Sequence, residues 1–161
     1  MALGDFAPGY YDMTWNGNGT GLVKDVRRLR RRSRAAPITA DKYGDSMIDG
    51  VYRGGDCFLL CTFIEWTPAI RALLWPYDSD FGVMGQCGRL LTDLAKALVL
   101  TAEAGSPAAA EGPASITAAK SILAPENDVE ILLGNESRDV PVLLQLFPYQ
   151  DASQLRWFST T

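Results

Sequence analysis

The segment CFLLCTFIEW, residues 57–66, decides the fold that this sequence predicts. It is rich in aromatic and β-compatible residues, so we expect a central strand. Alternation with a period of two places Cys57 and Cys61 on one face of that strand, where free thiols pack as small apolar groups. The third cysteine, Cys87, leaves an odd number without metal-site spacing. A strand of this length also predicts a long sheet edge over residues 55–66 that invites pairing with another chain.

Further strands are expected on both sides of this segment. The stretches at residues 10–15 and 20–26 flank an Asn-Gly turn at 16–19, which supplies the positive φ of a tight hairpin. Three more candidates follow downstream, and Pro141 in the last of them indicates an edge position or an irregular start. These candidates are SITAAKSIL (115–123), VEILLG (129–134) and DVPVLLQLF (139–147).

One short helix is expected at residues 68–75, because Thr67 offers an N-cap and Pro68 suits the first helical position. Residues 89–103 mix a helical first half with a strand-like ALVLTA, and residues 104–115 form a Pro/Ala/Gly/Ser loop. The sum predicts a single mainly β domain over the whole chain: a β-sandwich or partly closed barrel with one short flanking helix.

Composition favours a soluble, non-enzymatic protein. The 161 residues are 47% hydrophobic and 21% charged, as in globular domains. The N-terminal residues lack the pattern of a secretory signal, and no apolar run approaches the roughly 18 residues of a membrane span, so we expect a soluble protein made in the cytoplasm.

The motifs of catalysis and cofactor binding are missing from the sequence. There is no histidine, which excludes Ser-His-Asp and Cys-His nucleophilic sites and the commonest metal ligand. The glycine clusters at 17–21 and 82–88 lack the sixth-position glycine of a dinucleotide site or the Lys-Ser/Thr of a phosphate loop. Asp78 and Asp80 lack a surrounding calcium loop. We therefore predict no catalytic, cofactor or metal site.

The run VRRLRRRSR, residues 26–34, opposes the overall charge. Residues 1–34 carry seven basic and three acidic side chains, net +4, whereas residues 35–161 carry eight and sixteen, net −8, which gives the total of −4. Three interpretations remain open, in order of preference: docking onto carboxylates of another copy, a solvated loop, or nucleic-acid binding. The arginines concerned are Arg27, Arg28, Arg30, Arg31, Arg32 and Arg34; the candidate acceptors are Asp41, Asp45, Asp49, Asp78, Asp80, Glu126, Asp128, Glu130, Glu136 and Asp139.

Two further segments complete the predicted interface. Residues 26–49 suit a long hairpin arm or an extended loop that projects from the sheet. Near the C-terminus, Trp157 and Phe158 carry more apolar area than a free tail exposes, so they are expected to pack on their own body or on a neighbour.

The order of segments resembles the tail tube (major tail) proteins of long-tailed bacteriophages. The resemblance covers most of the chain: a glycine-bounded strand, a small-residue loop, and a closing Val-Pro-Val strand that leads to Pro-Tyr and an aromatic end. The residues that carry it are ITADKYGDSMIDGVYRGGDCFLLCTFIEW (38–66), FGVMGQCGRLLTDLAKALVLTA (81–102) and SITAAKSILAPENDVEILLGNESRDVPVLLQLFPYQDASQLRWF (115–158).

This resemblance implies a structural subunit of the virion tail that is assembled in the host cytoplasm and needs no cofactor. Six copies would form a ring, stacked rings would form a hollow tube, and the arm at residues 26–49 would reach the next ring. Other tail proteins would bind the tube ends, and the genome would pass through the lumen without specific binding. A neutral or acidic lumen suits that passage, so the arginines belong at the ring-to-ring or outer surface. Alternatives are another ring-forming tail component (a distal tail, terminator or baseplate protein) or a nucleic-acid-binding module that uses residues 27–34.

Overall fold

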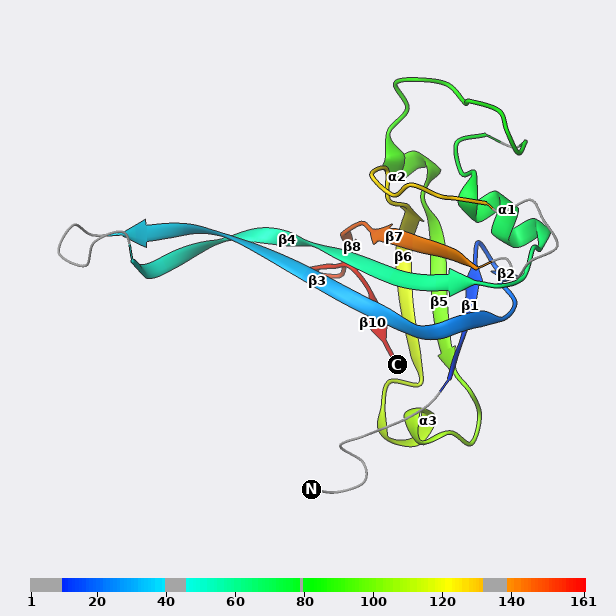
Figure 1. Ribbon diagram of the computed structural model, residues 1–161. Coiled ribbons are helices and arrows are strands. Elements are labelled where there is room, and N and C mark those ends of the chain that lie inside the picture. The colour runs from blue at the N-terminus through cyan, green and yellow to red at the C-terminus, as the bar shows by residue number, and fades with distance from the viewer. Residues whose placement is uncertain (1–9, 40–45, 79, 132–138) are drawn as a thin grey trace.

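The computed structural model of the protein describes residues 10–39, 46–78, 80–131 and 139–161 (Figure 1). These residues are mainly β, as predicted. They form one eight-stranded antiparallel sheet and a separate two-stranded hairpin. The sheet order is β2-β1-β5-β6-β7-β4-β3, with β10 paired to β6, and β8 pairs with β9.

The described elements follow one another along the chain without an internal repeat. They are β1 (Tyr11–Trp15), β2 (Asn18–Gly19), β3 (Val23–Thr39), β4 (Met47–Phe63), α1 (Pro68–Leu74), α2 (Leu91–Leu94), β5 (Lys96–Ala102), α3 (Pro107–Glu111), β6 (Ser115–Leu123), β7 (Val140–Leu146), β8 (Tyr149–Asp151), β9 (Gln154–Arg156) and β10 (Ser159–Thr160).

The β3–β4 hairpin dominates the shape of the molecule, because its two strands have 17 residues each. The inner half of β4, from Cys57 to Phe63, lies between β3 and β7, whereas the outer half pairs with β3 alone. The outer half therefore projects far beyond the rest of the sheet (Figure 1). The predicted sheet edge at residues 55–66 is wrong, since β3 folds back along β4 and becomes the edge strand itself.

The buried core lies between the two halves of the sheet. Every second residue of β4 from Cys57 to Phe63 is buried, and the alternating buried residues of β7 from Val140 to Leu146 join the same cluster. β6 pairs with β7 only over Ser121–Leu123. This short contact lets the sheet change direction, so β5 and β6 run across the direction of β3 and β4 (Figure 1). The remaining buried members come from the other strands and α1, and include Met13, Trp15, Leu98, Leu100, Ile70 and Leu73.

The local turn and helix signals act as predicted. Asn16 and Gly17 have φ values of 53° and 76°, which closes the tight β1–β2 hairpin. At the start of α1, the Thr67 hydroxyl accepts a hydrogen bond from the Ile70 amide at 3.2 Å. The helix buries its apolar face, and it ends before Trp75.

Four predicted elements differ from the structure. The second strand of the first hairpin is only β2, because the chain from Val23 onward pairs with β4 instead. The single flanking helix is joined by α2 and by α3, and α3 lies within the predicted loop at 104–115. Residues 129–131 are not a strand, and 132–134 lie outside the described residues. Pro141 has the edge position that its sequence suggested, since this part of β7 pairs with β4 but not with β6. Among the described helices none is long and apolar enough to cross a bilayer.

Substitutions in the cross-strand pair Leu29–Leu59 test whether β4 is buried and β3 is an exposed edge at the hairpin base. Leu59 is 1% exposed and Leu29 is 42% exposed, although they face each other across β3 and β4. Leu59→Ala should lower the free energy of unfolding by about 3 kcal/mol, because it leaves a cavity in the core. Leu29→Ala, the matched control, should cost about 1 kcal/mol or less. Urea unfolding followed by circular dichroism measures both, and equal losses would contradict the assignment of β3 as an exposed edge.

Candidate self-assembly surface

The predicted arm at residues 26–49 lies within a longer hairpin that has two chemically different parts. The hairpin base, Val23–Arg32 against Asp56–Phe63, belongs to the main sheet through β4 and β7. The hairpin extension, Ser33–Thr39 against Met47–Gly55, projects beyond it. Most of the arginine run lies on the base. At about 3.3 Å per residue, the seven residues from Ser33 to Thr39 extend roughly 20 Å.

A backbone irregularity marks the junction between base and extension. The β3–β4 register shifts between Ser33 and Ala35, and Gly54 opposite this shift has a φ of 84°. At the neighbouring Gly55, an added Cβ would lie 2.3 Å from the backbone oxygen of Arg32, so the two strands approach too closely there for a side chain. These glycines permit the bulge at which the hairpin leaves the sheet.

The pleat of β3 divides the arginines between the two faces of the sheet. Directly paired residues point to the same face, and Leu29 and Arg31 are paired with the buried Leu59 and Cys57. Arg31 therefore belongs to the inner face, which carries the core. The arginines at 28, 30 and 32 pair with Leu60, Phe58 and Asp56 and belong to the opposite, open face.

The two inner-face arginines, Arg27 and Arg31, rest on aromatic rings. The Arg27 guanidinium lies 4.7 Å from the centre of the Tyr10 ring and donates to its hydroxyl oxygen at 3.3 Å. Arg31 lies 5.4 Å from the Trp157 ring and 5.9 Å from the Tyr52 ring, and donates to the Tyr52 hydroxyl at 3.2 Å. The Arg31 contact ties the edge strand to the C-terminal segment, and the Arg27 contact ties it to the residue before β1, so both arginines have a structural role.

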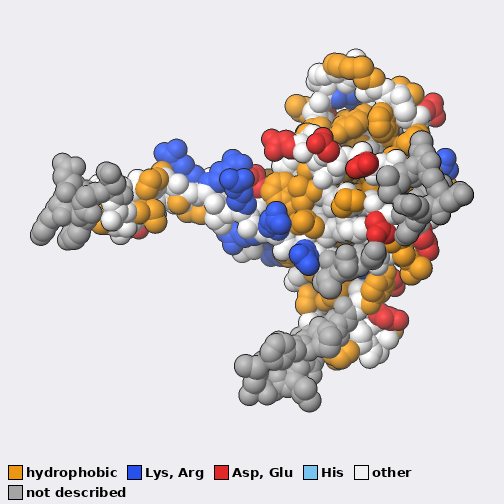
Figure 2. Space-filling view, viewed as in Figure 1, with side chains coloured by type: hydrophobic (Ala, Val, Ile, Leu, Met, Phe, Trp, Pro, Cys, Tyr) orange, Lys and Arg blue, Asp and Glu red, His pale blue; other side chains and the backbone are white. Residues whose placement is uncertain are grey.

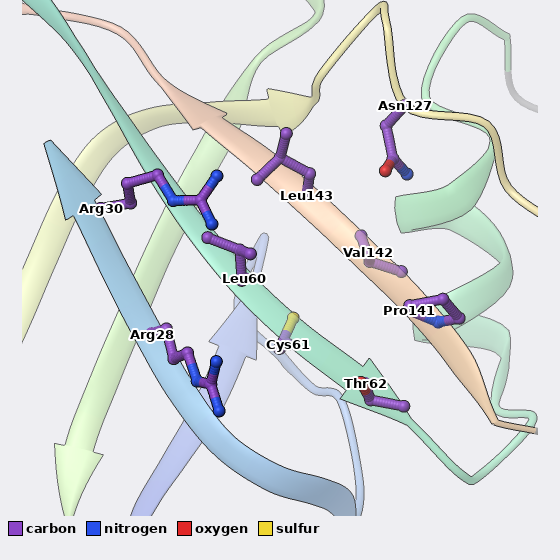
Figure 3. Close-up of a pocket in the computed structure, with 9 residues that line it drawn as sticks. All are labelled: Arg28, Arg30, Leu60, Cys61, Thr62, Asn127, Pro141, Val142 and Leu143. Carbon is purple, nitrogen blue, oxygen red and sulfur yellow. The ribbon is translucent and has the colours of Figure 1, made fainter. Parts of the chain in front are cut away.

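The open-face arginines line a groove. Two cavities of about 350 and 450 Å³ share Arg30 and Leu143 in their walls and are therefore neighbours. Arg28 and Arg30 extend from β3 toward β4, while Asn127 lies on the far side of β7 (Figure 3). Arg32 and Arg34 line the second cavity together with Glu126. Arg34 forms an ion pair with Asp56, which belongs to the same hairpin.

The hairpin extension carries a cluster of exposed apolar side chains that the sequence analysis did not predict. Its exposed fractions are 43% for Ile38, 63% for Met47, 50% for Ile48, and 56% each for Val51 and Tyr52. We call these five residues the apolar tip. Figure 2 shows Lys and Arg side chains along the hairpin base and hydrophobic side chains further out along the extension. Side chains of this size, exposed together on a two-stranded ribbon, are typical of a binding surface. The sequence MIDGVY at residues 47–52 could have indicated this surface, because it is largely hydrophobic and lies opposite the Ala-Ala-Pro-Ile of β3.

The other predicted interface residues are scattered. Asp41 and Asp45 lie outside the described residues, and Asp49 lies on the extension, where its carboxylate accepts a 2.7 Å hydrogen bond from the Gly50 amide. Trp157 and Phe158 are half-buried against their own core, next to β10. The C-terminal segment is thus fixed to the body of the same chain.

Most of the candidate acceptors lie on the body of the protein. Glu126, Asp128 and Glu130 are exposed along one segment next to the groove, and Asp78 and Asp80 lie in the connection after α1. Glu136 lies outside the described residues, and Asp139 directly precedes β7. Among the described residues no group of three or more His, Cys, Asp or Glu side chains is arranged to hold a metal ion.

The two thiols of β4 are buried on one face, as predicted, whereas Cys87 is exposed. Burial raises the pKa of the Cys61 thiol from 9.0 to about 12, against the opposing charge of Arg27. Burial also raises the pKa of Cys57, although a backbone hydrogen bond from Phe58 and the charge of Arg31 lower it in part. Both thiols therefore act as apolar packing groups.

Comparison with known proteins gives no family assignment. No model of a known protein family matches the sequence, and no curated protein matches it either.

Thiol labelling at pH 8 tests the burial of Cys57 and Cys61 and the exposure of Cys87. With a pKa near 12, about one Cys61 in ten thousand is ionised at that pH, so Cys87 alone should react quickly in the folded protein. All three thiols should react in denaturant, and the Cys87→Ser variant should show no fast thiol when folded. The unfolded Cys61 ionises near 9.0 and the folded one near 12, so this residue's contribution to stability is lost as the pH rises between these values. Two fast thiols in the folded wild type would contradict the burial of β4.

Proposed function

We propose that this protein is a structural subunit of a bacteriophage tail tube that self-assembles into stacked, hexameric rings. The observation that carries the proposal is the β3–β4 hairpin, whose extension leaves the sheet and presents a cluster of exposed apolar side chains. The second support is the resemblance of the sequence to tail tube proteins. On this proposal the protein acts in the virion tail by binding copies of itself, without catalysis or a cofactor.

Burial of the apolar tip against a partner would be energetically favourable, whereas its exposure to water is not. Removing apolar surface from water yields about 25 cal/mol per Å², so five large side chains that become buried contribute several kcal/mol to an interface. A lone two-stranded ribbon gains little stability of its own in water. A second copy that covers the tip would supply both the apolar contact and the rigidity.

A second exposed apolar region on the body offers a possible receiving surface. In the connection between α1 and α2, Phe81 is 51% exposed, Met84 is 80% exposed and Leu90 is 66% exposed. In Figure 1 this connection and the hairpin tip lie at opposite ends of the molecule. Contact between two different surfaces of identical copies is heterologous, and such contacts generate closed rings or open-ended polymers. Both kinds of assembly occur in a tube of stacked rings.

The rest of the proposed architecture follows from the resemblance to tail tube proteins. A sheet that changes direction around one core supports a sandwich-like or partly closed barrel body, from which the arm reaches the next ring. The genome passes through the lumen without specific binding, other tail proteins bind the tube ends, and assembly takes place in the host cytoplasm. An open face that carries arginines would retain DNA, so on this proposal it faces a neighbouring copy or the outside of the tube.

Another ring-forming tail component, such as a distal tail, terminator or baseplate protein, shares the arm and the self-association that this proposal uses. Such a protein would form one or a few rings. The length of the polymer formed by the purified protein distinguishes the two functions.

Charge introduced at the apolar tip tests the proposal. Purified wild type should form rings and stacked tubes in negative-stain electron microscopy, whereas the double variant Ile48→Asp/Val51→Asp should stay folded but form no stacked tubes. An aspartate that is buried without a partner loses its hydrating water, so any contact that buries the tip becomes unfavourable.

The control places the same two aspartates on exposed apolar residues of the body, Leu22 and Ile64, which are 58% and 37% exposed. This control variant should assemble like the wild type, and circular dichroism should show all three proteins folded. A wild type that remains monomeric at high concentration would refute the proposed function. Unchanged assembly of the tip variant would refute the role of the hairpin.

A further inference from the structure

The open face of the sheet carries two opposed rows of charge on either side of the groove. One row consists of Arg28, Arg30 and Arg32 on β3, and we call it the arginine row. The other consists of Glu126, Asp128 and Glu130 in the segment that follows β6, and we call it the acidic row. All six side chains are exposed.

The arginine row has regular spacing and, among the described residues, no ion-pair partner. Alternate residues of a strand are about 6.6 Å apart, so the three guanidinium groups lie at nearly equal intervals along one face. Within the described part of the chain, the ion pairs of the arginine run are limited to that of Arg34 with Asp56. No described group accepts a hydrogen bond from the side chains of Arg28, Arg30 or Arg32. The arginine row is therefore available to a partner.

The acidic row has a matching alternation, which packing imposes. Val129 and Ile131 pack against the core, and Asn127 is half-buried. The residues between them, Asp128 and Glu130, consequently point away from the core, and Glu126 is exposed in the preceding turn. Asp128 and Glu130 therefore lie on one side of this segment, and Glu126 precedes them in a turn that the Asn127 amide closes by donating to the Ala124 carbonyl at 2.9 Å.

The two rows do not neutralise each other within one molecule, because strands β4 and β7 separate them. The acidic segment continues the β6 side of β7, where the Ala124 amide donates to Leu143 at 2.8 Å. Three interstrand spacings of about 4.8 Å each therefore separate it from β3, roughly 14 Å in total. Among the described residues no ion pair joins the rows. In Figure 2, acidic side chains lie on the body beside the basic hairpin base.

The floor between the rows suits a protein partner. Leu60, Phe58 and Leu143 line it, and all three are half-buried. At its edge the side-chain amide nitrogen of Asn127 is buried and has no hydrogen-bond acceptor. An apolar floor between charged rims is typical of a protein–protein interface.

We propose that the arginine row of one copy binds the acidic row of a second copy, so that the open face is the lateral interface between neighbouring subunits. This inference rests on the proposed function and names the contact that joins subunits within a ring. Each copy offers its arginine row to one neighbour and its acidic row to the other, which makes the contact heterologous. The arginine fork can hold each carboxylate with two hydrogen bonds, so three arginines and three carboxylates can pair across the contact.

Charge complementarity favours a second copy over nucleic acid as the occupant. A phosphate backbone would match the arginine row but would lie against the acidic row across the same groove, where like charges repel. A second copy satisfies both rows together. The contact should also weaken as the salt concentration rises, because the charges are exposed before association.

Two charge-reversed variants that are mixed together test the inference. The first is Arg28→Glu/Arg30→Glu/Arg32→Glu, and the second reverses the acidic row to lysine. Each variant alone meets like charge at the interface, so each should need an about tenfold or higher concentration to assemble. In an equimolar mixture every contact between unlike variants is complementary, and rings with alternating subunits should form again. Analytical ultracentrifugation and negative-stain microscopy measure the assemblies.

A third variant controls for net charge. Three reversals of two charges each change the net charge from −4 to −10 in the first variant. Lys96→Glu/Lys120→Glu/Asn18→Asp/Gln154→Glu makes the same change, from −4 to −10, at exposed positions outside the groove, the hairpin extension and the α1–α2 connection, and should assemble like the wild type. Circular dichroism establishes that every variant is folded.

The possible outcomes separate this inference from the proposed function. If the wild type assembles and the folded reversal variants assemble equally well, or if their mixture stays unassembled, the pairing of the rows is refuted while the tube subunit stands. A monomeric wild type refutes both. If the wild type is monomeric and binds duplex DNA at low salt, and the first variant does not bind it, the arginine row is assigned to nucleic acid instead.

Discussion

The backbone ladder between β3 and β4 is the interaction on which the rest of the structure depends. Over the hairpin base it connects a strand in which seven of the ten residues 23–32 are charged to a strand whose alternate residues form the centre of the core. The arginine strand contributes little apolar surface of its own. Its position is fixed by β4, which is in turn held by β7 on its other side. A hydrophobic strand thus supports a charged one, and the same ladder then continues outward to support the projecting extension.

The pleat of a single strand gives neighbouring arginines different tasks. Arg31 lies over two aromatic rings on the inner face and ties the C-terminal segment to the hairpin, while Arg30 and Arg32 on either side point to the open groove. Six arginines in nine residues therefore do not act as one basic patch. This division explains how a basic run and an acidic body coexist, since the inner members are used for packing and the outer members remain available for a partner.

Local signals in the sequence predicted much of the fold, and long-range partnership explains what they missed. Asn16-Gly17, Thr67-Pro68 and the alternation around Cys57 act through neighbouring residues, so the turn, the helix start and the buried strand face followed from the sequence. Which strand occupies a sheet edge depends on residues far apart in the chain, and the edge was predicted on β4 when it belongs to β3. For the same reason the apolar tip was missed, because Ile38 and Val51 come together only when the hairpin closes.

An edge strand of this composition also limits how copies of the protein can associate. Two β3 edges brought together would oppose one arginine run to another, which disfavours direct pairing between them. Sheet-edge charges of this kind prevent uncontrolled strand addition while they leave the faces of the sheet free. On the proposed function, association would be directed to the two surfaces that differ in chemistry, the apolar tip and the charged groove. Because one contact is mainly hydrophobic and the other mainly electrostatic, salt should weaken the second far more than the first, and the two contacts can form in a defined order.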